Sequence, residues 1–354
     1  MATIAATVDD IDATFLGEVL RCPGAVRSVR ATRIGTGQVA LSLRLDLDWV
    51  DGPDDGRPSV LIAKIPAPEP ASREAARLHT TYQREVGFYR DVSSKVSVPH
   101  PRSLHAEIDG ESGDFTLIME PAVGVVGDQL AGCSAAEATA MVDAAVGLHA
   151  PTWDRLDDFG SLTWLPVLDP SLLEIRRDAY RALLPGFVKR FSSRLDAEVI
   201  EAARWLGDHF VDASLAHRSA FCLTHGDFRL DNMLFDTAAD GSSSVTVLDW
   251  QTVTFGRGAV DVAYGLGSGL LPDLRRKHES SLVDRYVEGL LGAGIVCDPD
   301  DVRRDYQLGT VSGLRMSVVA SQQVASTERG DEMFAVMAER HAWQMADNDV
   351  FSLV

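Results

Sequence analysis

The sequence is poor in basic residues, and this shortage narrows the choice of partners. Lysine and arginine together number 33, against 52 aspartates and glutamates, which gives a net charge of −19. Such an acidic surface repels phosphate backbones and anionic lipid, so we expect neither nucleic acid nor a membrane as partner. The charge favours a cationic small molecule only weakly, because many proteins are acidic for solubility alone.

Cysteines and long apolar runs are also scarce. The four cysteines lie far apart, at Cys22, Cys133, Cys222 and Cys297. This spacing fits neither a disulfide framework nor a zinc site, and it predicts a cytoplasmic protein. No run of 18 uncharged apolar residues is present, so no membrane span is expected. The first 20 residues carry three aspartates and no basic residue, which is not the pattern of a signal peptide.

Hydrophobic periodicity predicts an α+β chain that is β-rich in its first third. Residues 26–49 alternate apolar and polar side chains on both sides of a glycine turn, which predicts two strands. Residues 59–66 are nearly all apolar, as in a central strand covered on both faces, and Lys64 interrupts them. We expect one long helix over 71–92 and another strand over 115–121.

The remaining chain has mostly helical spacing. Residues 134–149 predict an amphipathic helix capped by Ser134, and a helical pattern returns over 171–217. Two short strands with polar ends interrupt it. We therefore predict two domains, a nucleotide-binding one at 1–120 and a helical one with the catalytic loop, metal site and acceptor-binding helices at 121–354.

Polar side chains gather in one stretch between apolar runs, LTHGDFRLDNMLF at 223–235. Asp227 and Asn232 lie five residues apart in an expected loop, and Asp249 ends a short strand 17 residues after Asn232. A hairpin joining the two segments would bring the three side chains to one end of a sheet. Carboxylate and amide oxygens suit Mg²⁺, and a second carboxylate can take a proton from an attacking hydroxyl.

Two other interpretations of this stretch are open. It could be a tight loop whose Asp and Asn side chains cap turns, although two such segments in this order argue against that. It could also be a hydrolase site in which His225 and Asp227 bind a transition metal. The other eight histidines form no HxxxH pair, which argues against the second interpretation.

His-Gly-Asp, four residues, Asn and then a later Asp on a short strand resemble the catalytic core of the aminoglycoside phosphotransferase-like kinases. Four further stretches are most similar to the ecdysteroid and choline kinase-like branch: DWQ at 249–251, GRG at 256–258, DVAY at 261–264 and LHAPTW at 148–153. The resemblance covers residues 25–345. It implies a protein-kinase-like fold with two lobes, in which a β-rich N-lobe carries one long helix and the C-lobe is mainly helical.

The resemblance implies a role for each residue of this core. Asp227 would orient and deprotonate the acceptor hydroxyl, while Asn232 and Asp249 would hold Mg²⁺ against the ATP phosphates. His225 would hold the loop by hydrogen bonds. Asp261 would help to fix the loop, and a plain helix cap is a second role that is compatible with the first.

ATP also needs a fixed cation and a lid for its phosphates. Lys64 is the one lysine between Met1 and Lys95, and in the kinase fold a third-strand lysine contacts the phosphates and pairs with a helix glutamate. Glu85 is the expected partner, although Glu74 lies on the same predicted helix. Gly35 and Gly37, in the turn between the first two strands, would let backbone N–H groups approach the phosphates.

The adenine site and the acceptor site rest on the resemblance. Backbone groups of Glu120 and Ala122 would bond the adenine. Six side chains are candidates for lining the acceptor site, although the core is the simpler place for the aromatic ones: Trp153, Trp164, Tyr180, Trp205, Arg315 and Trp343. An acidic pocket would suit an aminoglycoside or choline, whereas the ecdysteroid-like branch suggests a bulky apolar alcohol.

The function that this sequence predicts is an ATP- and Mg²⁺-dependent phosphotransferase acting on a small-molecule hydroxyl. One alternative is a catalytically silent pseudokinase or scaffold, which would have no need of Lys64, Asp227, Asn232 and Asp249 together. Another is a protein kinase. The absence of Asp-Phe-Gly, in whose place Asp-Trp-Gln stands, and of a downstream Ala-Pro-Glu argues against that alternative and against activation-loop switching.

Overall fold

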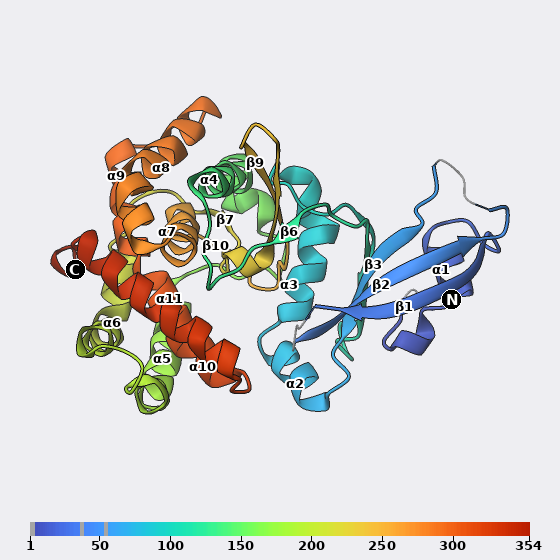
Figure 1. Cartoon of the computed structure of the whole chain (residues 1–354), viewed down its shortest axis with the longest axis horizontal. Helices are drawn as coiled ribbons and strands as arrows, with labels where there is room; N and C mark the ends of the chain where they lie inside the picture. The colour runs from blue at the N-terminus through green and yellow to red at the C-terminus, as the bar shows by residue number, and fades with distance from the viewer. Residues whose placement is uncertain (1–3, 36–38, 53–55) are drawn as a thin grey trace. The chain divides into compact units, whose positions relative to one another are not determined.

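The computed structural model describes residues 4–35, 39–52 and 56–354 (Figure 1). These residues form two compact units. Unit 1 comprises the described part of Met1–Lys95 together with His100–Val123 and Leu248–Val253. Unit 2 comprises Val96–Pro99, Gly124–Val247 and Thr254–Val354. The assignment of nucleotide binding to residues 1–120 and of catalysis to residues 121–354 stays a prediction.

Unit 1 is built on an antiparallel sheet with the strand order β1-β2-β3-β5-β4. Its strands are β1 (Val26–Ile34), β2 (Ala40–Trp49), β3 (Val60–Pro66), β4 (Ser103–Ile108) and β5 (Phe115–Met119). The predicted pair of strands around the glycine turn is confirmed, and so is the central position of β3. Along β3 buried and half-buried side chains alternate, and none is exposed, which agrees with its nearly apolar sequence.

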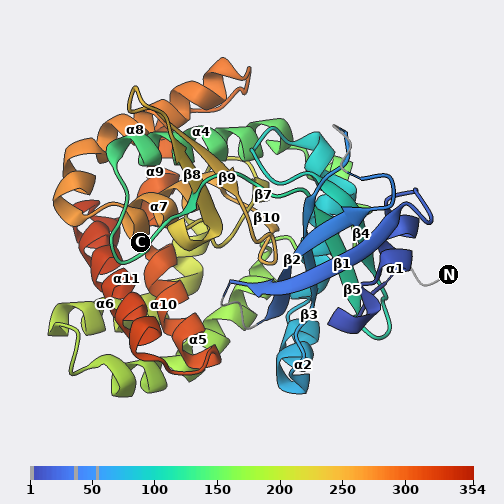
Figure 2. The ribbon, with the colours of Figure 1, turned by 45° about the vertical axis from the view of Figure 1, so that its right-hand side comes forward.

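The core of unit 1 lies between this sheet and helix α1 (Ala13–Val19), which Figure 2 shows beside the strands. Leu43 and Leu45 of β2 are buried, while Arg44 between them is exposed, as the period of two requires. Asp12 caps α1, since its Oδ1 accepts a hydrogen bond of 2.7 Å from the N–H of Phe15.

The single long helix predicted over 71–92 is interrupted in the structure. It consists of α2 (Pro70–Leu78), α3 (Thr81–Gly87) and a π-helical turn, η2 (Phe88–Val92). Thr80 has φ of 54°, a left-handed conformation that ends α2, and the hydroxyl of Thr81 donates to the carbonyl of Ala76. Side-chain bonds of this kind compete with helical ones, and hydrophobic periodicity does not register them.

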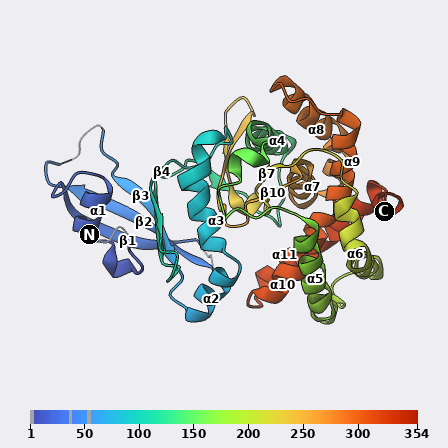
Figure 3. The same ribbon diagram turned by 180° about the vertical axis from the view of Figure 1, so that it is seen from behind.

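Unit 2 is mainly helical (Figure 3). Its helices are α4 (Ala135–His149), α5 (Pro170–Phe191), α6 (Ala197–Leu215), α7 (Gly258–Gly269), α8 (Pro272–Gly292), α9 (Pro299–Gly309), α10 (Val311–Gln323) and α11 (Glu328–Asp347). The predicted cap of α4 is confirmed by reciprocal bonds between Ser134 and Glu137. Buried aromatic and aliphatic residues of α5, α6, α10 and α11 form one core.

Short strands of unit 2 frame the polar stretch. β8 (Met233–Thr237) and β9 (Ser243–Val247) form a hairpin, with β6 (Val125–Val126) along the other edge of β8. β7 (Cys222–Thr224) pairs with β10 (Thr254–Gly256). The predicted hairpin is therefore present. All four cysteine thiols are free. Among the described residues, no helix combines the length and the apolar character needed to cross a bilayer.

Candidate active site

A charged cluster occupies the middle of unit 1. The ammonium of Lys64, on β3, lies 2.5 Å from Glu85 Oε1 on α3 and 3.1 Å from Asp249 Oδ1. Glu85 is 2% exposed, whereas the Asp249 side chain is 27% exposed. Glu74, the alternative partner, is exposed and lies 3.6 Å from Arg77. The structure thus brings together Lys64 and Glu85, as the kinase resemblance implied, and adds Asp249.

The cluster holds one positive charge between two carboxyl groups. Burial alone would lower the pKa of Lys64, but the charges of Asp249 and Glu85 outweigh it and raise that pKa. Lys64 therefore stays protonated. Burial raises the pKa of Glu85, despite the opposing charge of Lys64. With both carboxyl groups ionised the cluster carries an excess of negative charge, which a further cation would stabilise.

The segment that presents Asp249 is anchored by its neighbour. The ring of Trp250 is fully buried and stacks on Phe88, with centroids 3.6 Å apart and planes inclined by 5°. Asp249 itself has φ of 65°, a left-handed conformation that costs a non-glycine residue roughly 1–3 kcal/mol. Its Oδ2 accepts a 3.1 Å hydrogen bond from Gln251. Packing of Trp250 and these polar bonds together hold the carboxylate in place.

A second cluster surrounds Asp227, in the loop between β7 and β8 of unit 2. Its Oδ1 accepts hydrogen bonds from the Tyr264 hydroxyl at 2.8 Å and from Arg229 Nε at 3.1 Å. Its Oδ2 accepts one from Asn232 Nδ2 at 2.9 Å. The backbone N–H of Asp227 donates to Nδ1 of His225 at 3.2 Å. These bonds fix both oxygens of the carboxylate before any ligand arrives.

Asp227 is an ionised group with little basicity. Burial alone would raise its pKa, but the charge of Arg229 and the hydrogen bond from Tyr264 outweigh burial and lower that pKa. Burial and the charge of Asp227 raise the pKa of Tyr264 well above its ordinary value, so the phenol stays a donor. A weakly basic carboxylate of this kind orients a hydroxyl and takes its proton late in a reaction.

Asp261, on α7, holds the backbone of the same loop. Its Oδ2 accepts from the N–H of His225 at 2.6 Å, and its Oδ1 accepts from the N–H of Gly226 at 3.0 Å. Gly226 has φ of 82°, which explains why glycine follows the histidine. The plain helix cap is wrong for Asp261, because α7 begins earlier, with Arg257 at its N-cap.

The side chains predicted to bind Mg²⁺ have suitable oxygen atoms. Asn232 Nδ2 donates both to the carbonyl and to Oδ2 of Asp227, at 2.8 and 2.9 Å. Two oxygen acceptors fix the orientation of the amide, so its Oδ1 is the atom that can bind a cation. An amide oxygen and the Asp249 carboxylate are hard ligands that suit Mg²⁺. In the hydrolase alternative His225 would bind metal, but its Nδ1 already accepts from Asp227.

The other predicted nucleotide contacts are only partly described. Gly35 follows β1 and has φ of 70°, a conformation that favours glycine, whereas Gly37 lies outside the described residues. The N–H of Glu120 donates to the carbonyl of Arg102 at 3.0 Å, so only its carbonyl is available to an adenine. Ala122 follows two residues later and is half-buried.

Two residues of the Asp227 cluster were not singled out from the sequence. Arg229 stands in the polar stretch itself, and its Nη1 also bonds Asp231 at 2.5 Å. Tyr264 follows Asp261 by three residues, a spacing that places both on one side of a helix. That spacing was a usable signal for Tyr264, because Asp261 was already expected to face the loop.

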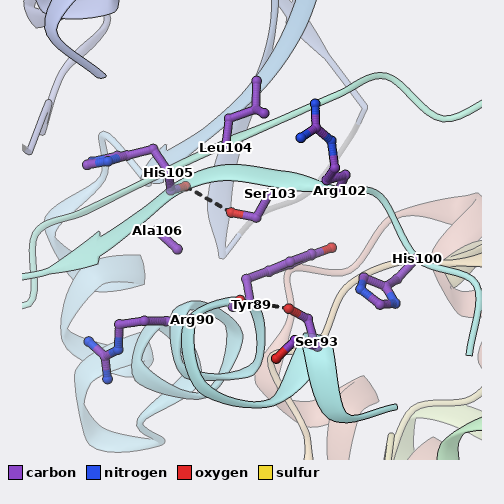
Figure 4. Close-up of a pocket in the computed structure, with 10 residues that line it drawn as sticks. Tyr89, Arg90, Ser93, His100, Arg102, Ser103, Leu104, His105 and Ala106 are labelled. Carbon is purple, nitrogen blue, oxygen red and sulfur yellow. Dashed lines mark hydrogen bonds between the residues drawn. The ribbon is translucent and has the colours of Figure 1, made fainter. Parts of the chain in front are cut away.

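A cavity of about 380 Å³ lies in unit 1, between β4 and the segment that follows α3 (Figure 4). Its lining is mixed and includes Arg90, Arg102 and His100, but neither Lys64 nor Glu85. Arg90 is paired with Asp91 and Arg102 with Glu120. The cavity is therefore separate from the Lys64 cluster. Among the described residues, no three His, Cys, Asp or Glu side chains are grouped to hold a metal.

Most aromatic candidates for the acceptor site belong to the core of unit 2. Trp153 is 6% exposed and Tyr180 is fully buried, with its hydroxyl bonded to the carbonyl of Ala203. Trp205 stacks on His209. These three positions agree with the simpler interpretation of the aromatic spacing, which placed such residues in the core, whereas Trp343 is exposed.

Several solved structures of other proteins have a similar architecture. This chain is similar to choline kinase from Cryptosporidium parvum, at 10% identity over 92% of this chain and 91% of that chain, with a TM-score of 0.55. It is also similar to Plasmodium vivax ethanolamine kinase (14% identity, 92% and 83% covered, TM-score 0.54). A third similar structure is the GDP complex of an aminoglycoside 2′-phosphotransferase IIIa mutant, at 14% identity over 92% of this chain and 95% of that chain, with a TM-score of 0.52.

Identities this low establish the fold alone, and they confirm the two-lobed, protein-kinase-like α+β fold expected from the sequence. A comparison with curated proteins found no match. The sequence model described as the phosphotransferase enzyme family matches residues 48–303. Because that match covers well over half of the chain, the protein belongs to the phosphotransferase enzyme family.

Proposed function

We propose that the protein transfers the γ-phosphoryl group of ATP to a hydroxyl of a small molecule, with Mg²⁺ as cofactor. The observation that carries this proposal is the Asp227 carboxylate, which is ionised and bonded by Tyr264, Arg229 and Asn232. A fixed anion with low basicity suits an incoming hydroxyl, which it can align without first becoming protonated itself. Membership of the phosphotransferase family supports the reaction type.

Lys64 is the residue that would bind the phosphates. Its ammonium has two carboxylate partners, and the more exposed of these is Asp249. Glu85 would keep the ammonium in place while phosphate oxygens contact its remaining side. Backbone groups at Gly35 and Gly37 would approach the phosphates, and those of Glu120 and Ala122 the adenine.

Asn232 Oδ1 and the Asp249 carboxylate would hold Mg²⁺, which neutralises charge on the phosphates when it is bound. The excess negative charge around Lys64 supports this assignment, because a cation relieves it. The proposal requires that the two clusters act on the same nucleotide.

The bond changes balance without any further reactant. The acceptor oxygen forms a bond to the γ-phosphorus, the bond between that phosphorus and the β,γ-bridging oxygen breaks, and ADP leaves. The acceptor proton passes to Asp227 and from there to water. Tyr264 and Arg229 keep their hydrogen bonds to the carboxylate and hold its direction during the transfer.

A panel assay tests this function. The protein is incubated with Mg·ATP and a set of alcohols. ADP release is measured for each alcohol, and mass spectrometry shows whether that alcohol has gained a phosphoryl group. The proposal predicts at least one phosphorylated alcohol with the wild type and none above background with Asp227→Ala. If nucleotide stabilises the protein against heat but no alcohol or water accepts phosphate, the scaffold alternative is correct instead.

A further inference from the structure

The loop that carries Asp227 is held by the fold on both sides of this residue. Asp261 bonds two backbone N–H groups that precede Asp227. After Asp227 the chain forms a short 3-10 turn, η6 (Leu230–Asn232), whose last residue is the proposed metal ligand. The first N–H group of such a turn has no acceptor within the turn. The N–H of Leu230 therefore needs an acceptor from elsewhere in the fold.

Gln129 provides this acceptor. It is 1% exposed and lies between β6 and α4 in the sequence. Its Oε1 accepts a 3.1 Å hydrogen bond from the N–H of Leu230, and its Nε2 donates at 2.5 Å to the carbonyl of Ser268, near the end of α7. One partner is a donor and the other an acceptor, so together they fix the orientation of the amide. Gln129 thus ties η6 to α7.

Gly127 brings the same segment against η6. Its N–H donates to the carbonyl of Met233 at 3.0 Å. A Cβ at this position would be 2.7 Å from the carbonyl oxygen of Leu230, which is too short for any side-chain atom. Glycine therefore lets the backbone lie directly on the turn. Residues 127–130 form a clamp on η6, through these hydrogen bonds and this close backbone packing.

Arg340, on α11, fixes the clamp in turn. It is 5% exposed, and its guanidinium donates at 2.7–2.9 Å to the carbonyls of Gln129, Leu130 and Ser268. The last carbonyls of a helix lack partners within it, and a cation near them is favourable. Ser268 lies in the last turn of α7, and its carbonyl accepts from both Arg340 and Gln129. The clamp is therefore held by buried polar bonds to α7 and α11.

We propose that Gln129 is a positioning residue of the reaction, which holds η6 so that Asp227 and Asn232 keep their directions. The proposal rests on the proposed function, to which it adds a residue outside the loop. The amide of Asn232 donates two hydrogen bonds to Asp227, so a shift of the turn moves both side chains. A displacement of about 1 Å can lower a rate by about 10²-fold.

Two substitutions of Gln129 test the proposal. Gln129→Met has a similar length and removes both bonds of the amide. We expect kcat to fall by about 10- to 100-fold, and half-maximal activity to need more Mg²⁺, because Asn232 is displaced. Gln129→Glu keeps an oxygen for the N–H of Leu230, and Arg340, which bonds the same carbonyl of Ser268, can neutralise the added charge. Its kcat should stay within about threefold of wild type, because the bond to the loop survives.

The control is Gln344→Met. Gln344 is also fully buried and donates to a carbonyl of α7, that of Ala263, but none of its hydrogen bonds among the described residues reaches the loop. Its substitution should lower stability in urea, while kcat and the Mg²⁺ requirement stay as in the wild type. Three results would each overturn the inference: wild-type kcat in Gln129→Met, a kcat as low in Gln129→Glu as in Gln129→Met, or an equal loss in Gln344→Met.

Hydrogen exchange separates this inference from the proposed function. The exchange of backbone amides over 228–233 is followed by mass spectrometry in wild type, Gln129→Met and Gln344→Met, and it needs no acceptor alcohol. Gln129→Met should speed exchange in this segment by about tenfold or more, because the N–H of Leu230 has lost its acceptor, whereas Gln344→Met should not. If no compound accepts phosphate, the proposed function fails and this measurement decides the inference. Exchange as slow in Gln129→Met as in the wild type would overturn it.

Discussion

The two clusters of charged residues are arranged in opposite ways. In unit 1 the cation Lys64 lies between two carboxyl groups, Glu85 and Asp249. In unit 2 the anion Asp227 lies among donors from Tyr264, Arg229 and Asn232. The first cluster has negative charge in excess and suits a metal with its phosphates. The second has both oxygens of its carboxylate occupied and suits the alignment of a neutral hydroxyl.

This contrast predicts that substitutions in the two units affect different steps. Asp227→Ala should lower kcat by roughly 10²–10⁴-fold, because alignment and proton acceptance are lost together. Affinity for Mg·ATP should stay within a factor of a few, since the Lys64 cluster is intact. Steady-state kinetics and calorimetry measure the two quantities. A large loss of nucleotide affinity in Asp227→Ala would mean that the two clusters do not affect different steps.

Lys64→Met should act on stability as well as on nucleotide binding. It leaves Glu85, which is 2% exposed, without its cation, and breaking a buried pair in this way costs about 3–5 kcal/mol. The raised pKa of Glu85 limits the loss, because protonation removes the unpaired charge. Urea denaturation should show the double variant Lys64→Met/Glu85→Gln to be more stable than Lys64→Met, with nucleotide binding still lost. Equal stability of the two variants would show that the unpaired Glu85 carboxylate does not cause the loss of stability in Lys64→Met.

The residues of the two clusters also show what the sequence could predict. Lys64, Glu85, Asp227 and Asn232 stand in short motifs whose chemistry is visible in consecutive residues. Tyr264 differs, because its hydrogen bond to Asp227 depends on how helix α7 lies against the loop between β7 and β8. The break at Thr80 escaped prediction for another reason: local side-chain bonds decide it, and the apolar pattern continues through it.

Acid should weaken unit 2 through His341. Burial lowers the pKa of this histidine from 6.5 to about 3. Between pH 6.5 and pH 3 this histidine is therefore protonated in the unfolded chain and neutral in the folded chain. Its contribution to the free energy of unfolding is fully present above pH 6.5 and falls as the pH drops. By pH 5 the loss from this residue should be roughly 2 kcal/mol, at about 1.4 kcal/mol per pH unit.

Denaturation of wild type and His341→Asn at several pH values isolates this effect. The variant starts from a lower stability, because it leaves a cavity, but its slope between pH 7 and pH 5 should be shallower. Parallel slopes in the two proteins would show that His341 is not the titrating group.

Tyr264→Phe should have the smallest effect. It removes one of the hydrogen bonds that lower the pKa of Asp227, and a hydrogen bond to a charged group contributes about 1.5–3 kcal/mol at most. We expect kcat to fall by about tenfold, and the acid limb of the pH–rate profile to move to higher pH, since activity is lost as Asp227 takes up a proton. An unshifted acid limb would show that the hydroxyl of Tyr264 does not lower the pKa of Asp227.

The central claim is that the two clusters serve one nucleotide, and a crystal structure of the complex with Mg²⁺ and a non-hydrolysable ATP analogue tests it most directly. The account predicts one metal ion bonded at about 2.0–2.1 Å both by Asn232 Oδ1 and by the Asp249 carboxylate, with Lys64 on the phosphates. A metal bound to the triphosphate and to only one of these side chains, or to neither, would contradict it.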